Sequence, residues 1–141
     1  MLSKLALELN SLSIHLTRHA RVADAQLGVP PARLSALSVL VFGGDRTMGQ
    51  LAAAELVTQA TMSRIVDGLE ASGLAARRRN PEDARSWVVR ATPKGRRLME
   101  RGRAARAERM AAVLAAVPPA DRPAVEQALK ALRRALTEVS S

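Results

Sequence analysis

The sequence predicts a mainly α-helical chain with one short β-hairpin, and three observations lead to this fold class. Apolar residues make up 48% of the 141 residues but aromatic residues only 1%, so the core must consist of Leu, Val, Ile, Met and Ala. These side chains recur at steps of three and four residues over most of the chain, as on a helix face. The spacing changes to alternation only between residues 74 and 92.

Two helices are expected at the N-terminal end. Leucines in residues 2–27 repeat at helical spacing with polar residues between them. Gly28 and Pro30-Pro31 end this helix and begin a second one over residues 31–42, because proline is favoured in the first turn of a helix. Gly43-Gly44-Asp45 then predicts a turn.

Two further helices lie close together in the sequence. Thr47 and Gln50 fit a capping box, so a third helix begins there and runs to about Leu56. Thr58 can cap a fourth helix over residues 59–72. The short connection between the two is typical of a helix–turn–helix.

A basic hairpin follows directly. Gly73 ends the fourth helix, residues 74–78 predict a strand, and Asn80-Pro81-Glu82-Asp83 predicts a turn. The second strand alternates over residues 86–92 and places three side chains on one face: Trp87, Val89 and Ala91. A hairpin in this position makes the domain a winged helix–turn–helix.

Two helices complete the chain. Thr92-Pro93 begins a long helix that extends to about Ala116, and Val117-Pro118-Pro119 ends it. Residues 121–139 form a last helix with one apolar stripe. The first helix and these two are too apolar on one side to stand alone in water.

The fourth helix has the two faces that a DNA-reading helix needs. Met62, Ile65, Val66 and Leu69 form an apolar face that can dock on the domain. The other face offers hydrogen-bonding groups, and a small residue, to a major groove about 12 Å wide. Its candidate contact residues are Thr58, Gln59, Ala60, Thr61, Ser63 and Arg64.

The net charge is concentrated in one segment. Residues 77–109 hold twelve basic and four acidic residues, and so carry +8 of the formal net charge of +9. Such a segment favours phosphates or an anionic membrane surface. The Ala-rich helix over residues 94–116 lacks the Trp and Phe that insert into lipid, which argues against the membrane.

Composition and motifs exclude several classes of protein. The absence of cysteine excludes disulfides, thiolate metal sites and a Cys nucleophile. No catalytic or nucleotide-binding motif is present, so neither an enzyme nor a cofactor is expected. No apolar run approaches the roughly 18 residues that cross a bilayer, and Glu8 interrupts the N-terminus where a signal peptide is uncharged. We expect a cytoplasmic protein.

Three short motifs resemble the signature of the MarR-type transcriptional regulators. They are Gly73-Leu74-Ala75-Ala76-Arg77, Asp83-Ala84-Arg85 and Thr92-Pro93-Lys94-Gly95, which are similar to G-L-V-x-R, D-x-R and T-x-x-G. Ala75 stands where valine is usual and Ala91 where leucine is usual, so the hairpin is expected to pack less tightly. The resemblance implies a repressor with helix 59–72 in the major groove and wing 74–92 in the minor groove.

The resemblance also implies roles for the residues of the wing. Arg85 would enter the minor groove, whose negative potential attracts arginine, and Asp83 would brace it through a salt bridge. Arg77, at the base of the wing, would either touch phosphate or pack structurally. The predicted DNA-binding set is completed by Arg78, Arg79 and Ser86.

The terminal helices of that family join two subunits. Here the leucines at positions 2, 5, 9 and 12 would meet Val125 and the leucines at positions 129, 132 and 136. Residues 1–29 would then be a dimerisation helix, 30–92 the DNA-binding domain, and 93–141 a long helix and a C-terminal dimerisation helix, all in one structural subunit. A homodimer implies an inverted-repeat operator, whereas the alternative is a helical bundle within one chain.

An effector and two other functions stay open. Many regulators of this type release DNA when a small molecule binds between the dimer helices and the winged domain. The first helix offers His15, Arg18 and His19 for such a role, and His15 and His19 lack the further ligands of a zinc site. The alternatives to sequence-specific DNA binding are a winged-helix module for protein–protein interaction and an RNA-binding module.

Overall fold

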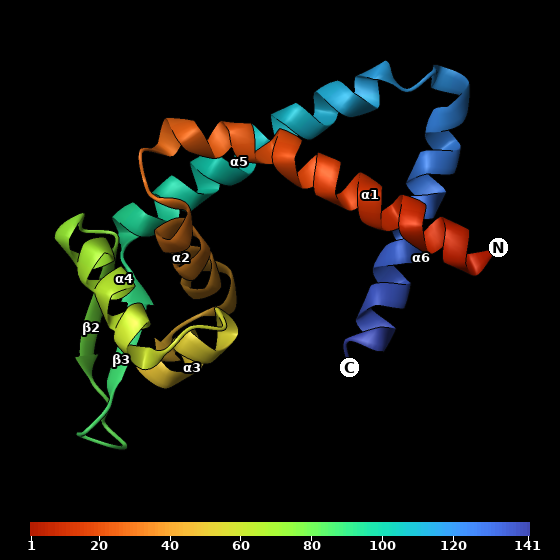
Figure 1. The fold of residues 1–141 in the computed structure, drawn as a ribbon. Coiled ribbons are helices and arrows are strands. Elements are labelled where there is room, and N and C mark those ends of the chain that lie inside the picture. The colour runs from red at the N-terminus through yellow and green to blue at the C-terminus, as the bar shows by residue number, and fades with distance from the viewer.

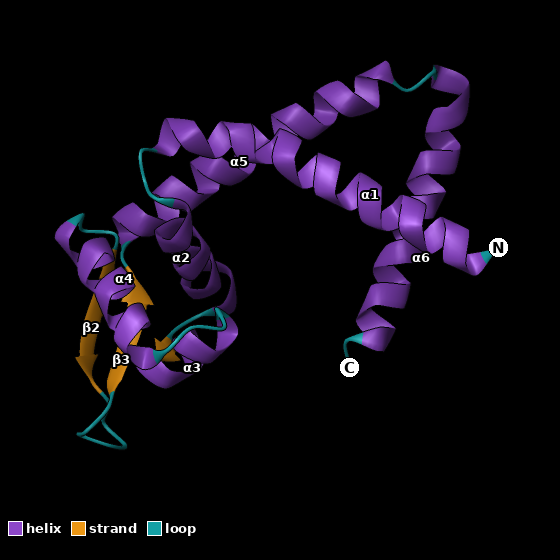
Figure 2. Cartoon of the chain, in the orientation of Figure 1, coloured by secondary structure: helices purple, strands orange, loops and turns teal.

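The computed structural model describes residues 1–141 as a winged domain from which two helical arms extend (Figure 1). The winged domain contains α2, β1, α3, α4, β2, β3 and the start of α5, and its small sheet lies at one end of a helical molecule (Figure 2). The arms are α1 and the pair formed by the end of α5 and α6. The helices are α1 (Leu2–Arg21), α2 (Pro31–Gly43), α3 (Met48–Ala54), α4 (Gln59–Ala71), α5 (Pro93–Ala116) and α6 (Arg122–Val139). The strands are β1 (Arg46–Thr47), β2 (Ala75–Arg79) and β3 (Trp87–Ala91), and the 3-10 helices are η1 (Val22–Leu27) and η2 (Pro119–Asp121).

The predicted helix caps are confirmed. Thr47 and Gln50 form the complete capping box at the start of α3. The hydroxyl oxygen of Thr58 accepts the backbone N–H of Thr61 at 3.1 Å, and that of Thr92 accepts the N–H of Gly95 at 3.1 Å. These bonds satisfy N–H groups that a helix leaves free at its first turn.

The prediction of one continuous helix over residues 2–27 was wrong in its last turns. The α-helix ends at Arg21, and the tighter η1 follows, after which the chain bends by 96° into α2. This winding buries Ala23 and brings Leu27 against Gly102 of α5, where an added Cβ would lie 2.8 Å from the Leu27 side chain.

A short strand was also missed. β1 pairs antiparallel with β3, which pairs antiparallel with β2, so the order is β1-β3-β2. The register sets Ala75 opposite Ala91 and Arg79 opposite Trp87. Two residues are too few to show alternation, and the partner of β1 lies about forty residues further along the chain.

The core is aliphatic and lies in the winged domain. It joins buried residues of α2, α3, α4, both hairpin strands and the start of α5: among the largest are Leu37, Leu40, Leu51, Met62, Leu69 and Leu74. Gly95 lets α5 approach the sheet, because a Cβ there would lie 2.1 Å from the backbone oxygen of Leu74.

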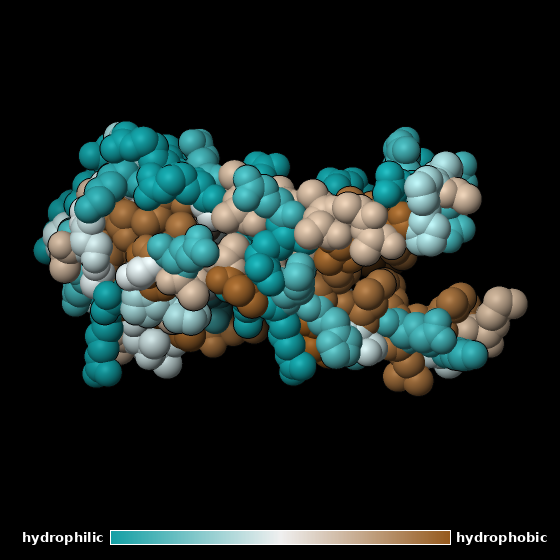
Figure 3. All heavy atoms as spheres, turned by 90° about the horizontal axis from the view of Figure 1, so that it is seen from above, coloured by the Kyte–Doolittle hydropathy of each residue, from teal (hydrophilic) through white to brown (hydrophobic).

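The arms have no core of their own. Neither α1 nor α6 buries a residue, and apolar side chains gather on the arms around the open space between them (Figure 3). No single helix is long and apolar enough to cross a membrane, and only the bent pair Leu2–Leu27 and Pro31–Gly43 reaches that length and composition together.

Leu56 occupies an unfavourable backbone conformation in the turn between α3 and α4. Its φ is +56°, and its side chain is 92% exposed, so no packing compensates the strain. We expect Leu56→Gly to raise the free energy of unfolding by about 0.5–1 kcal/mol, because glycine adopts this region without a Cβ clash but costs more entropy on folding.

Chemical denaturation of Leu56→Gly and of the control Leu56→Ala will check this expectation. Alanine removes the exposed apolar surface but keeps the Cβ, so its midpoint should stay near that of the parent protein. An equal gain in both variants would show that the backbone of Leu56 carries no strain.

Candidate nucleic-acid interface

The first two turns of α4 present their polar side chains to solvent. Met62, Val66 and Leu69 are fully buried, and this fixes the rotation of the helix about its axis. As a result Ser63 is half-buried and the other five predicted contact residues are exposed: Thr58, Gln59, Ala60, Thr61 and Arg64. Both predicted faces of the helix are therefore present.

The start of α4 is held close to the start of α3. The side-chain amide of Gln59 rests over Gly49, where an added Cβ would lie 3.3 Å from its nitrogen. A Cβ at position 49 would require this amide to shift by a few tenths of an ångström, so the glycine permits the close approach.

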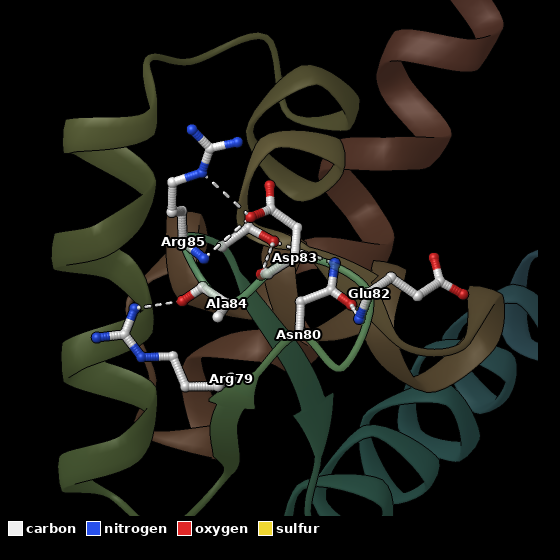
Figure 4. A network of polar contacts seen from close by, with 7 residues as sticks. Arg79, Asn80, Glu82, Asp83, Ala84 and Arg85 are labelled. Atoms are coloured by element: carbon white, nitrogen blue, oxygen red, sulfur yellow. Dashed lines mark hydrogen bonds and ion pairs between the residues drawn. The ribbon is translucent and has the colours of Figure 1, made fainter.

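The tip of the wing carries an arginine held by an aspartate. The backbone N–H of Arg85 donates to Asp83 Oδ1 at 3.0 Å, and its Nε lies 3.4 Å from the same oxygen (Figure 4). The side chain of Arg85 is 94% exposed. The predicted brace exists, and it leaves most of the guanidinium free for a ligand.

Asn80 organises the turn that presents Arg85, whereas sequence analysis predicted only that it lies in the turn. Its Oδ1 accepts the backbone N–H of Glu82 at 3.1 Å, and its Nδ2 donates to Ser86 Oγ at 3.0 Å. The Ser86 hydroxyl in turn donates to the backbone oxygen of Asp83 at 3.2 Å. Ser86 thus has two partners within the wing.

The arginines of β2 differ in their surroundings. The Arg79 guanidinium lies over the Trp87 ring, 4.0 Å from its centroid, and donates to the backbone oxygen of Ala84 at 3.1 Å. Arg78 is exposed and points to the opposite face of the strand, away from Arg77 and Arg79.

Arg77 is engaged by two carboxylates of α4. Its Nη2 pairs with Asp67 Oδ1 and its Nε with Glu70 Oε1, and its side chain is only 16% exposed. Burial lowers the pKa of Arg77, but hydrogen bonds and charge from Glu70 and Asp67 outweigh this, so the pKa is raised and the guanidinium stays charged. Of the two predicted roles, this geometry corresponds to structural packing.

Six of the twelve predicted contact residues line one hollow of about 490 Å³. It lies between the starts of α3 and α4 and the wing, and residues from all three line it: Gln59, Ser63, Arg77, Arg85 and Trp87 among them. The polar turns of α4 and the tip of the wing therefore share one surface of the molecule.

Comparisons with known proteins identify the family. The sequence model described as MarR family matches residues 27–86. An HTH-type transcriptional regulator of Mycobacterium bovis is 32% identical over 120 residues, which are 85% of this chain and 84% of that protein. The chain belongs to the MarR family of transcriptional regulators.

Solved structures agree with this membership. A MarR family protein from Bacillus stearothermophilus has a TM-score of 0.79 and 26% identity, over 96% of this chain and 95% of that one. A variant of MepR from S. aureus bound to an oligodeoxyribonucleotide shares the fold, with a TM-score of 0.71 and 19% identity over 94% and 97%. The winged helix–turn–helix prediction is confirmed, and MarR relatives are transcriptional regulators rather than enzymes.

One of the two histidines of this MarR chain, His19, lies at the joint between α1 and α5. Arg109 Nε donates to the backbone oxygen of His19 at 2.6 Å, and the His19 ring lies 3.2 Å from the backbone oxygen of Arg109. His15 and Arg18 are exposed on α1. No cluster of three metal-ligating side chains exists in the structure.

Two hollows of about 540 and 520 Å³ flank the same joint. Both are lined by residues of η1, α2 and α5: Asp24, Leu34, Ser38, Met99 and Arg106. Asp24 pairs with Arg106, whose pKa is raised by hydrogen bonds to Asp24 against partial burial. His15, Arg18 and His19, the effector residues expected from the sequence, line neither hollow.

Asn80 offers a direct test of how the wing is held. We expect Asn80→Ala to lose both side-chain hydrogen bonds, so the amide of Glu82 exchanges faster with solvent while global stability falls by no more than about 1–2 kcal/mol. Hydrogen exchange followed by NMR measures this.

The variant Asn80→Asp separates the two bonds. It keeps the oxygen that accepts from Glu82 but loses the donor to Ser86, so protection at Glu82 should persist. Unchanged exchange at Glu82 in Asn80→Ala would contradict the assigned role.

Proposed function

We propose that this MarR-family chain is a cytoplasmic repressor that binds a specific inverted repeat in double-stranded DNA as a homodimer. In each subunit α4 enters the major groove and the wing, residues 74–92, enters the adjacent minor groove. The observation that carries this proposal is the shared surface of the exposed polar turns of α4 and the free Arg85 guanidinium. The DNA-bound MepR variant supports the same use of the fold.

Major-groove contacts in the proposal come from the first turns of α4. Gln59 and Arg64 can each make two hydrogen bonds to a base edge, whereas Ala60 can contact a thymine methyl group. The free N–H groups at the start of the helix suit a phosphate.

Minor-groove and phosphate contacts come from the wing. Arg85 lies at the tip of the wing with its side chain exposed, and Asp83 contacts its Nε. Arg78 and Arg79 are exposed and can meet phosphates on either side of the strand, and Ser86 stays in the proposed set near the tip. Arg77 contributes indirectly, by holding the wing, because its hydrogen-bond donors are occupied by Asp67 and Glu70.

The arms are proposed to join the two subunits. Leu5, Leu12, Leu129 and Leu136 are each more than half exposed in the single chain. Burying such side chains contributes about 1.5–3 kcal/mol each, so a second copy would cover these faces. Two-fold symmetry then sets the half-sites about 34–36 Å apart, one turn of DNA.

We further propose that the hollows beside η1 are the effector site. Apolar side chains and the Ser38 hydroxyl meet there beside the Asp24–Arg106 ion pair, and these groups suit a small apolar molecule that carries a hydrogen-bonding group. A ligand in this joint would change the angle between arm and winged domain, and with it the spacing of the two α4 helices.

Binding to the DNA upstream of its own gene tests the DNA-binding proposal. The parent protein should bind this duplex far more tightly than a scrambled duplex, with a strong dependence on salt. Arg85→Ala should weaken binding and reduce the salt slope by about one, and Gln59→Ala should relax base preference at a cost of about 1–3 kcal/mol. Fluorescence anisotropy over a range of salt concentrations measures both.

A matched variant separates contact from net charge. Arg101→Ala removes the same charge from an exposed position on α5, outside the helix–turn–helix and the wing. It should alter affinity less than Arg85→Ala. Equal binding to scrambled duplex, or preference for RNA, would refute the sequence-specific DNA proposal in favour of the alternative module.

The homodimer is tested by replacing one apolar residue of α6. Leu132→Gln should shift the chain from dimer to monomer at micromolar concentration, because it places an amide in the proposed seam. Lys130→Gln puts the same side chain on the polar side of α6, where Lys130 pairs with Glu126, and should leave the dimer intact. Light scattering distinguishes the two, and a monomeric parent protein would contradict the dimer.

A further inference from the structure

An ion-pair cluster around the half-buried guanidinium of Arg77 connects α4 to the base of the wing. Asp67 and Glu70 lie three residues apart and so on one side of α4, and both reach Arg77 of β2. Because the guanidinium is planar and its Nε and Nη2 each hold a different carboxylate, the cluster constrains both the distance and the angle between helix and strand.

The cluster continues along the wing towards Arg85. The Arg77 guanidinium lies 6.0 Å from the centroid of the Trp87 ring, and Arg79 lies 4.0 Å from it. Arg79 then donates to the backbone oxygen of Ala84, next to Arg85. A chain of contacts therefore runs from the middle of α4 to the residue before the tip arginine.

The two acidic residues lie where their negative charge would weaken the binding of DNA. Asp67 and Glu70 follow Arg64 by one to two turns on the DNA-reading helix, and Asp67 is 66% exposed. Carboxylates near a phosphate backbone repel it, so charge alone predicts that their removal would tighten binding. Their presence calls for a compensating structural role.

We propose that Asp67, Glu70 and Arg77 act as a strut that sets the wing at the spacing required for α4 and Arg85 to occupy neighbouring grooves together. This inference rests on the proposed DNA-binding function. Arg77 is then a positioning residue, because its hydrogen-bond donors bind Asp67 and Glu70 within the chain. Breaking the strut lets the wing move relative to α4. When α4 then binds the major groove, Arg85 is no longer held in position for the minor groove.

The test uses two double variants with equal changes of charge. Asp67→Asn with Glu70→Gln removes both carboxylates of the strut. The control, Glu82→Gln with Glu100→Gln, removes two exposed carboxylates of the wing turn and α5 that hold no ion pair in the structure. Both variants gain two units of positive charge, so a purely electrostatic effect would be similar in the two.

We expect the strut variant to bind operator about ten- to a hundredfold more weakly than the parent protein, although it is more positive. Its binding to scrambled duplex should not weaken, because phosphate attraction is retained. The control should bind operator as tightly as the parent or more tightly. In the strut variant Arg85→Ala should cost less than in the parent, since the wing is no longer held in place.

The single tryptophan provides a readout of the strut without DNA. Trp87 lies beside Arg77, so the strut variant should shift its emission, and the control should not. Arg77→Lys keeps the charge but loses the planar fork, and should show the same loss of operator affinity. Thermal unfolding confirms that each variant is folded at the temperature of the binding measurement.

The possible results separate the two proposals. A parent protein that fails to prefer operator refutes the DNA-binding function itself. The strut proposal is overturned if the parent protein prefers operator, and the folded strut variant and Arg77→Lys bind operator as tightly as the parent or more tightly. If Asp67→Asn with Glu70→Gln does not fold, Arg77→Lys alone decides the outcome in the same way.

Discussion

The burial of one side of α4 is the constraint on which the rest of the molecule depends. Met62, Val66 and Leu69 are fully enclosed by an aliphatic core, so the helix cannot rotate without exposing them. Its outer face is determined by this packing, because residues at 3.6 per turn leave Gln59 and Arg64 on the opposite side. The core needs no aromatic side chain, since branched and unbranched aliphatic residues pack closely between short helices and a small sheet.

Much of the fold is visible in the sequence because the signals are local. The caps at Thr47, Thr58 and Thr92 and the alternation of β3 each depend on residues within four positions of one another. The strand β1, the tight winding of η1 and the partners of Arg77 depend on residues brought together by the completed fold. For the same reason the sequence identified the polar groups of the interface but left the role of Arg77 between two alternatives.

The basic segment is less available to phosphate than its charge indicates. Arg77 pairs with Asp67 and Glu70, Arg106 pairs with Asp24, and Arg109 binds His19. Three of its twelve basic residues therefore hold helices and strands of this chain together. The total charge determines the long-range attraction to a polyanion. Direct contact with phosphates, however, comes only from the arginines that are exposed.

The joint between α1 and α5 connects the arms to the winged domain. Arg109 ties α1 to α5 through the backbone and ring of His19, and Arg106 ties η1 to α5 through Asp24. Helix α5 begins in the winged domain and ends in an arm (Figure 1), so in the proposed dimer a change of angle at this joint would move the winged domain relative to the arms. In the proposed dimer, the strut at the wing would determine the spacing of contacts within a half-site, and the joint at α1 would determine the spacing between half-sites.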